Sequence, residues 1–197
     1  MPRGLEGPAP DERPQPEGRR NEQGIRITPE DAGEQPTHRA VLSAQVWHEP
    51  GVLAKVSGLF SRRQFNIESL SVGPTETEGV ARITMVIEEH DPGIEQAKKQ
   101  LQKLVPVIAV RELREEAVER ELAMVKLDVR DDPDEVQAVA EMCDGDVVDI
   151  GPETITVELT GRESEIDAAL ETFERFTVRE VVRTGTAALA RGAEETT

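Results

Sequence analysis

Hydrophobic and polar residues alternate with a period near two over residues 40–47, which predicts a β-strand. Pro50 and Gly51 end this strand, and the apolar residues that follow recur at helical spacing. They are Leu53, Val56, Leu59 and Phe60, and they form one stripe of a short amphipathic helix. Asn66 closes the predicted helix, and residues 67–72 are predicted as the next strand.

A glycine therefore lies where a strand turns into a helix. The first N–H groups of that helix, those of Gly51, Val52 and Leu53, have no partner within the helix, and the helix start carries a partial positive charge. Such a turn suits a carboxylate. Asn66 lies at the far end of the same helix and could approach this turn in a neighbouring subunit. The geometry alone also fits a plain turn without a ligand.

The elements predicted after residue 72 complete a six-element unit. Residues 80–88 and 107–113 are predicted as strands, with a helix between them that begins at Asp91. One face of the first of these strands consists of Ala81, Ile83, Met85 and Ile87, and the buried stripe of the helix consists of Ile94, Ala97, Leu101 and Leu104. The order β-α-β-β-α-β predicts a four-stranded antiparallel sheet with both helices on one face. The other face must be solvated or covered by a partner, which favours a dimer.

The second half of the chain repeats this order of elements without repeating the residues. Its predicted strands are 122–129, 147–150, 154–160 and 178–183, and its predicted helices are 134–143 and 163–175. The sequence therefore predicts an α+β protein with two ferredoxin-like β-α-β-β-α-β domains in tandem. The turns of the second domain lack the glycine and asparagine of the first, so we assign this domain a scaffold or partner-contact role.

The expected boundaries follow from changes in composition. Residues 1–37 are rich in Pro, Gly, Glu, Arg and Gln, which predicts a disordered tail, with a partner-binding arm as the alternative. The first domain spans residues 38–114, and a charged linker spans residues 115–121. The second domain spans residues 122–192, and residues 193–197 are predicted as a frayed end.

Charge narrows the possible partners. The chain of 197 residues has 40 acidic and 23 basic residues and a net charge of −17, which argues against general affinity for nucleic acid or anionic membranes. Only 5 of the basic residues are Lys. A cytoplasmic protein in high salt needs such a surface, because salt screens the repulsion between carboxylates. The alternative is an acidic protein that works at an ordinary salt concentration. No stretch approaches the roughly 20 apolar residues of a membrane span, and no basic and apolar leader precedes the first domain.

The chain contains no recognisable catalytic set. Its three histidines, His38, His48 and His90, lack metal-ligand spacing, and one cysteine cannot form a zinc site. Motifs of nucleophilic catalysis and glycine-rich phosphate loops are absent. We therefore predict no catalytic and no metal-binding residue, and we expect a protein that binds one molecule and regulates another.

Two remaining features have structural interpretations. Cys143 continues the apolar pattern of the helix at 134–143, so we interpret it as a core residue rather than as a reactive thiol. The pairs Asp131-Asp132 and Glu88-Glu89 could be imagined as acid–base pairs. In so acidic a chain we interpret them as solvated surface.

The segment HEPGVLAKVSGLFSRRQFNIESLSVGPTE at residues 48–76 resembles the amino-acid-binding ACT domain. Within that group it is similar to the small, regulatory subunits of acetolactate synthase (acetohydroxyacid synthase). Many ACT domains share PGVL, whereas the longer run from GLFSRR to VGPTE is particular to this family. The resemblance continues through residues 101–105, 119–126, 185 and 191–192, and so covers about residues 39–192.

The resemblance implies an effector site. In the family, two ACT domains pair side by side so that their sheets join, and branched-chain amino acids, chiefly valine, bind at the interface. This places Gly51, Val52 and Leu53 at the effector's carboxylate. It places Asn66, with Ile67 beside it, at the ligand held by the other subunit.

Three further positions concern the same site. The resemblance places Gly73 where a small residue leaves room for the ligand's side chain. His48 stands where the family often has Asn, and an imidazole can still donate to a carboxylate, with a different reach and pH response. Gln64 stands where Gly is usual; because a non-glycine residue disfavours positive φ, the helix is expected to end differently.

We therefore expect a cytoplasmic regulatory subunit that forms a homodimer through its first domain and joins a separate, large catalytic subunit. By the resemblance it activates that subunit and makes it sensitive to valine, with leucine or isoleucine as other effectors. Thiamine diphosphate, magnesium and FAD would belong to the catalytic partner, and this chain would hold no cofactor. The alternatives are a stand-alone ACT-domain sensor that regulates another enzyme or transcription, and an enzyme in its own right.

Overall fold

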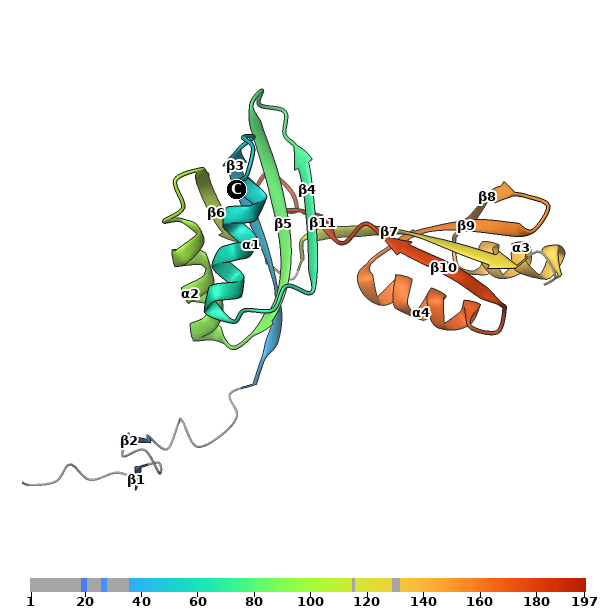
Figure 1. Cartoon of the computed structure of the whole chain (residues 1–197), viewed down its shortest axis with the longest axis horizontal. Helices are drawn as coiled ribbons and strands as arrows, with labels where there is room; N and C mark the ends of the chain where they lie inside the picture. Colours follow the sequence, from blue (N-terminus) through green and yellow to red (C-terminus); the bar gives the residue numbers. More distant parts are fainter. Residues whose placement is uncertain (1–18, 21–25, 28–35, 115, 129–131) are drawn as a thin grey trace, which may run out of the picture. The chain divides into compact units, whose positions relative to one another are not determined.

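The change from period-two to helical spacing at Gly51 coincides with the junction of a strand and a helix in the computed structural model (Figure 1). The structure describes residues 19–20, 26–27, 36–114, 116–128 and 132–197. In the first domain the elements are β3 (His38–Trp47), α1 (Val52–Arg63), β4 (Ser69–Pro74), β5 (Val80–Glu89), α2 (Asp91–Leu101) and β6 (Val107–Glu112). In the second they are β7 (Val118–Asp128), α3 (Pro133–Met142), β8 (Asp146–Ile150), β9 (Thr154–Gly161), α4 (Glu163–Phe173) and β10 (Val178–Arg183), followed by β11 (Ala187–Leu189).

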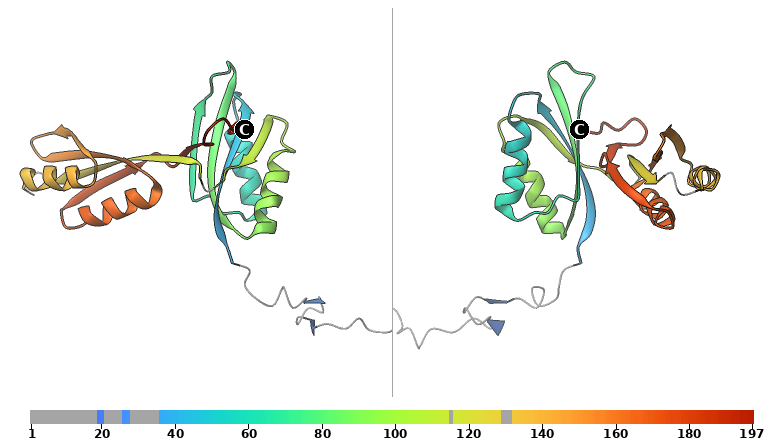
Figure 2. Two further views of the ribbon diagram at one scale, coloured as in Figure 1. Left: turned by 180° about the vertical axis from the view of Figure 1, so that it is seen from behind. Right: turned by 45° about the vertical axis from the view of Figure 1, so that its right-hand side comes forward.

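The two domains share one sheet topology. The first sheet has the order β4-β5-β3-β6 and the second the order β8-β9-β7-β10, and all neighbouring strands are antiparallel. Helices α1 and α2 lie on one face of the first sheet (Figures 1 and 2). The predicted α+β fold of two tandem ferredoxin-like domains is therefore confirmed.

Each domain has its own core between its sheet and its helices. In the first, the predicted faces of β5 and α2 are both buried, together with Phe60 and Val56 of α1. In the second, alternate residues of β7 and β9 pack against α3 and α4, and Phe173 is fully buried. The two periodicities in the sequence thus select the faces that pack together.

The end of α1 differs from the prediction. The helix ends at Arg63, and Gln64 caps it in the left-handed conformation with φ 60°. Its N–H donates to Ser61 O at 3.2 Å. Our expectation that Asn66 closes the helix was wrong, because this left-handed residue ends it two residues earlier. Gln64 also adopts the positive φ that we expected a non-glycine residue to avoid.

Strands begin or continue where we expected connectors. β7 starts at Val118, within the predicted linker, and β11 pairs with its first residues. Residues 193–197, predicted as a frayed end, contact the first domain: Thr197 Oγ1 lies 2.6 Å from Ser43 Oγ. These pairings join residues far apart in the sequence, so a local pattern does not reveal them.

Most of the predicted disordered tail lies outside the described residues. Within residues 1–35 the structure describes only β1 (Arg19–Arg20) and β2 (Arg26–Ile27), which pair antiparallel.

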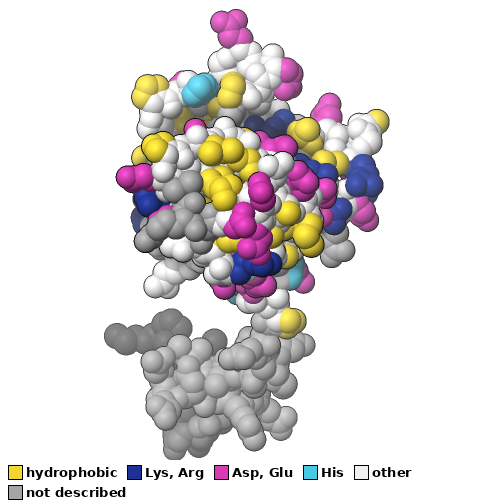
Figure 3. Space-filling view, turned by 90° about the vertical axis from the view of Figure 1, so that its right-hand side faces the viewer, with side chains coloured by type: hydrophobic (Ala, Val, Ile, Leu, Met, Phe, Trp, Pro, Cys, Tyr) yellow, Lys and Arg dark blue, Asp and Glu magenta, His cyan; other side chains and the backbone are white. Residues whose placement is uncertain are grey.

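Acidic side chains are spread over the face of the molecule in Figure 3, with Lys, Arg and apolar side chains between them. We expect the midpoint of thermal unfolding to rise steadily from about 10 mM to about 2 M KCl. The reason is that the screening length falls from about 30 Å at 0.01 M salt to about 3 Å at 1 M. Melting curves by circular dichroism measure this, and a flat or falling midpoint would contradict the high-salt interpretation.

Candidate functional site

The turn from β3 into α1 is built around Gly51, whose φ of 83° and ψ of 1° lie in the left-handed region. Glycine adopts this conformation without the steric cost that a Cβ brings. No side chain caps the start of α1, and its first turn contains no acidic residue. The N–H of Val52 makes one long hydrogen bond within the described part of the chain, to Glu49 O at 3.4 Å. In a chain of net charge −17, this helix start therefore retains donors and positive potential for an anion.

A cavity of about 170 Å³ lies beside this turn. Its lining includes Trp47, His48, Glu49, Gly51, Val52, Leu53 and Val72, and Val46, Ala81 and Ile83 of the sheet complete it. The rim carries apolar side chains that are unusually exposed: Val72 is 50% exposed and Leu53 44%. The site thus joins a polar corner, formed by backbone N–H groups, to an apolar wall. Such an arrangement can hold a small molecule that has a carboxylate at one end and an apolar group at the other.

Strand β4 contributes two neighbouring residues to opposite faces of the sheet. Val72 pairs with Ile83, which lines the cavity, so both lie on the helix side. Gly73 pairs with Arg82, whose guanidinium donates to Ser43 on the other face. A Cβ on Gly73 would meet nothing within 4 Å, but that space is on the face opposite the cavity. Val72, which lines the cavity, is not among the residues predicted for the site, because alternation alone does not show that an apolar residue of an edge strand stays exposed.

Asn66 and Ile67 lie at the opposite end of α1 from Gly51. The 12 residues of α1 span about 18 Å, so Asn66 does not reach the cavity of its own chain. Asn66 is exposed and donates to Glu68, and Ile67 packs against the core of the first domain. The structure thus brings His48, Gly51, Val52 and Leu53 together and separates Asn66 and Ile67 from them.

The other candidates for chemistry have structural roles. Asp132 caps α3, accepting from the N–H of Asp134 at 3.0 Å, whereas Asp131 lies outside the described residues. Glu88 accepts from Thr37, and Glu89 from the N–H of His90. Among the residues that the structure describes, no group of three or more His, Cys, Asp or Glu is placed to hold a metal ion.

Cys143 follows the last turn of α3 and is partly buried against the core of the second domain. Burial, and to a lesser extent the charge of Asp144, raises the pKa of its thiol. A raised pKa disfavours the reactive thiolate, in keeping with a packing role.

Comparison with known proteins decides the family. A model of the ACT domain typical of AHAS small subunits matches residues 42–109, and a model described as "Small subunit of acetolactate synthase" matches residues 120–192. The probable acetolactate synthase small subunit of Methanothermobacter thermautotrophicus is 45% identical over 156 residues, which cover 78% of this chain and 93% of that protein. The chain belongs to the acetolactate synthase small-subunit family.

Further relatives in this small-subunit family agree. The acetolactate synthase small subunit of Bacillus subtilis is 37% identical over 160 residues, covering 80% of this chain and 93% of that one. The crystal structure of the Thermotoga maritima small subunit is 35% identical, with a TM-score of 0.75 over 80% of this chain and 99% of that chain. These names describe the small subunit of an enzyme, as the sequence predicts. In this family the cofactors belong to the catalytic subunit. No helix in the described part of the chain is long and apolar enough to cross a membrane.

Proposed function

We propose that this chain binds valine, or another branched-chain amino acid, beside Gly51 and thereby regulates the large catalytic subunit of acetolactate synthase. The observation that carries the proposal is the uncapped start of α1 facing a small apolar cavity. The α-carboxylate would accept hydrogen bonds from the first N–H groups of α1. The branched side chain would lie against Val72 and Leu53.

The site would be completed by a second copy of the chain. A cavity of about 170 Å³ is smaller than the roughly 300–1,000 Å³ of most ligand pockets. Its rim is apolar and exposed, as in a surface that a partner covers. Asn66 is exposed and cannot reach the cavity of its own chain, so in a homodimer it is available to the ligand of the other subunit. Strand β4, at the edge of its sheet, offers unpaired backbone groups for joining two sheets.

The proposed regulation is activation of the cytoplasmic catalytic subunit together with feedback inhibition by valine. We expect the purified chain alone to form no acetolactate from pyruvate and to raise the activity of the catalytic subunit when the two are mixed. The Asn66→Ala chain should activate normally and lose most of the inhibition, because it lacks the amide offered to the ligand. Allosteric coupling is typically about 5–150-fold, which an acetolactate assay with and without valine resolves.

The matched control is Gln102→Ala, which removes an exposed amide side chain at the end of α2, away from the cavity. It should be inhibited like the wild type. Acetolactate formation by the chain alone would overturn the regulatory assignment, and full valine inhibition of Asn66→Ala would remove the two-subunit site.

A further inference from the structure

The face of the first sheet opposite its helices is covered by the last residues of the chain, residues 184–197, which we call the strap. Ala188 of the strap packs with Val41, Val86 and Leu113 in a small apolar cluster on this face. Val86 and Val41 are 1% and 5% exposed as a result. The far end of the strap is also fixed, because Arg82 donates to Thr197 Oγ1 at 2.6 Å.

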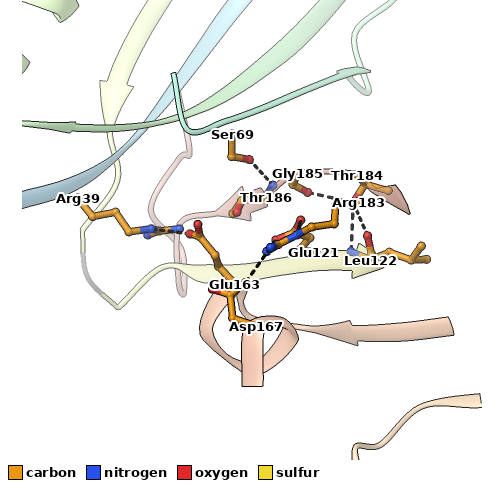
Figure 4. Close-up of polar contacts among 10 residues, drawn as sticks. All are labelled: Arg39, Ser69, Glu121, Leu122, Glu163, Asp167, Arg183, Thr184, Gly185 and Thr186. Atoms are coloured by element: carbon orange, nitrogen blue, oxygen red, sulfur yellow. Dashed lines mark hydrogen bonds and ion pairs between the residues drawn. The ribbon is translucent and has the colours of Figure 1, made fainter. Parts of the chain in front are cut away.

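The strap crosses β4 at one point. The N–H of Thr186 donates to Ser69 Oγ at 2.7 Å, and Ser71 Oγ donates to the carbonyl of Thr186 at 2.9 Å. Figure 4 shows Ser69 directed at Thr186 beside Gly185. A Cβ on Gly185 would lie 2.8 Å from Ser69 Oγ, and the φ of Gly185 is 77°. Only a glycine lets the strap pass this close to β4.

Strand β4 therefore contacts the strap with one face and lines the cavity with the other. Ser69, Ser71 and Gly73 lie on the strap side, and Val72 lies on the cavity side. Because a strand moves as one body, a shift of Val72 against a ligand would also shift the anchors of the strap.

The other end of the strap is held by the second domain. The N–H of Thr184 donates to the carbonyl of Leu122 at 3.0 Å. The preceding residue, Arg183, makes two hydrogen bonds to the buried carboxylate of Glu121, at 2.8 and 2.9 Å, and one to Asp167 at 2.7 Å (Figure 4). Only Gly185 separates this rigid anchor from the crossing point, so movement at β4 has a short path to β7 and α4.

One polar group is poorly satisfied at the crossing. Thr186 is 1% exposed, and its Oγ1 is buried without a hydrogen-bond partner in the described part of the chain. A buried hydroxyl without a partner opposes the seating of the strap. The free energy that favours the bound position of the strap is therefore smaller than its other contacts alone would give. A small free-energy difference between two positions is what a switching element requires.

We infer that the strap is a coupling element: binding of a ligand at the amino-acid site changes the position of the strap through β4, and the strap transmits this change to the second domain. This rests on the proposed effector site. A purely structural strap would cover the sheet in the same way with or without a ligand. A coupling strap would be held differently in the two states, and this difference between the states is measurable. Ser69, Ser71 and Thr186 are positioning residues in this scheme and do not touch the effector.

The test is amide hydrogen exchange of the full chain, with and without valine, read on peptides that cover the strap. Valine should change the exchange of residues 186–189 about fivefold or more in the wild type. In the Ser69→Ala/Ser71→Ala chain the exchange should be fast and insensitive to valine. Calorimetry should show that valine still binds, and valine inhibition of the reconstituted enzyme should fall at least about twofold.

Thr186→Val provides the opposite change. It keeps the shape of the side chain and both backbone hydrogen bonds and removes the unpaired hydroxyl, so exchange of the strap should become slower than in the wild type. Thr172→Ala is the control, since the hydroxyl of Thr172 donates to Ala168 O in its own helix, 2.9 Å away. It should behave like the wild type in all three assays.

The outcomes separate the two hypotheses. If the wild-type chain binds valine and the exchange of the strap does not change, the coupling role is overturned and the effector site stands. If the wild-type chain binds none of valine, leucine and isoleucine in calorimetry, the effector site is overturned and the coupling role with it. Normal valine inhibition in the Ser69→Ala/Ser71→Ala chain would also overturn the coupling role.

Discussion

A Gly51→Asp chain is expected to bind valine roughly a thousandfold more weakly than the wild type. The new carboxylate would face the carboxylate of the ligand at the start of α1. At about 4 Å and an effective dielectric constant of about 20, the repulsion is about 4 kcal/mol, or about three factors of ten. The first turn of α1 contains no acidic residue in the wild type, so the substitution changes the sign of the local charge.

Gly51→Asn separates charge from backbone conformation. Asn is close to Asp in size, and both tolerate the left-handed conformation of residue 51 at a cost of about 1–2 kcal/mol. Isothermal titration calorimetry should therefore give Gly51→Asn an affinity within about thirtyfold of the wild type. Raising the salt to about 1 M should restore part of the affinity of Gly51→Asp only, since salt screens exposed charges. Equal valine affinities of the Asp variant and the wild type would mean that the carboxylate binds elsewhere.

Arg183→Met should lower the free energy of unfolding by about 2–3 kcal/mol. Glu121 is 4% exposed, and Arg183 supplies its bidentate partner at 2.8 and 2.9 Å. The hydrogen bond to Glu121, then that to Asp167, raises the pKa of Arg183 against the opposing effect of burial. Loss of the guanidinium leaves a buried carboxylate unpaired, which typically costs about 3–5 kcal/mol. We expect somewhat less here, because the side chain of Arg183 is 34% exposed and solvent screens the pair.

Urea unfolding measures this difference, with two variants as references. Lys126→Met removes an exposed ion pair to Glu180, 3.3 Å long, on the same sheet; it should cost less than about 1 kcal/mol. The double variant Glu121→Leu/Arg183→Met removes both charges and should recover most of the stability, because the cost arises from the unpaired partner. A double variant no more stable than Arg183→Met would show that packing, not charge, dominates at this position.

The sequence predicts well what depends on local periodicity. The stripe of α1 and the alternating face of β5 are buried as expected, because a residue's face follows from its number within a helix or strand. The turn at Gly51 is likewise predictable from the sequence, since few residues other than glycine adopt its positive φ without strain.

What the sequence does not reveal depends on contacts between distant residues. Ser43 and Thr84 look like the polar face of solvated strands, yet they are 0% and 4% exposed. Their burial follows from the strap, whose last residue is 154 positions from Ser43. The candidate site shows the same limit. Val72 and Gly73 are adjacent in sequence, and only the pairing with β5 shows that Val72 alone lies on the cavity side.

The course of the strap changes what counts as the first domain. The chain leaves the first sheet after β6, builds the second domain from β7 to β10, and returns to cover the first sheet with residues 186–197. The second domain is in this sense an insertion into a discontinuous first domain. A chain truncated after Leu113 would lack the strap. Val41 and Val86 would then be exposed, and the apolar face that they form would be prone to association. An intact sensor module would instead need residues 38–117 joined to residues 184–197 by a short linker, with the second domain excised.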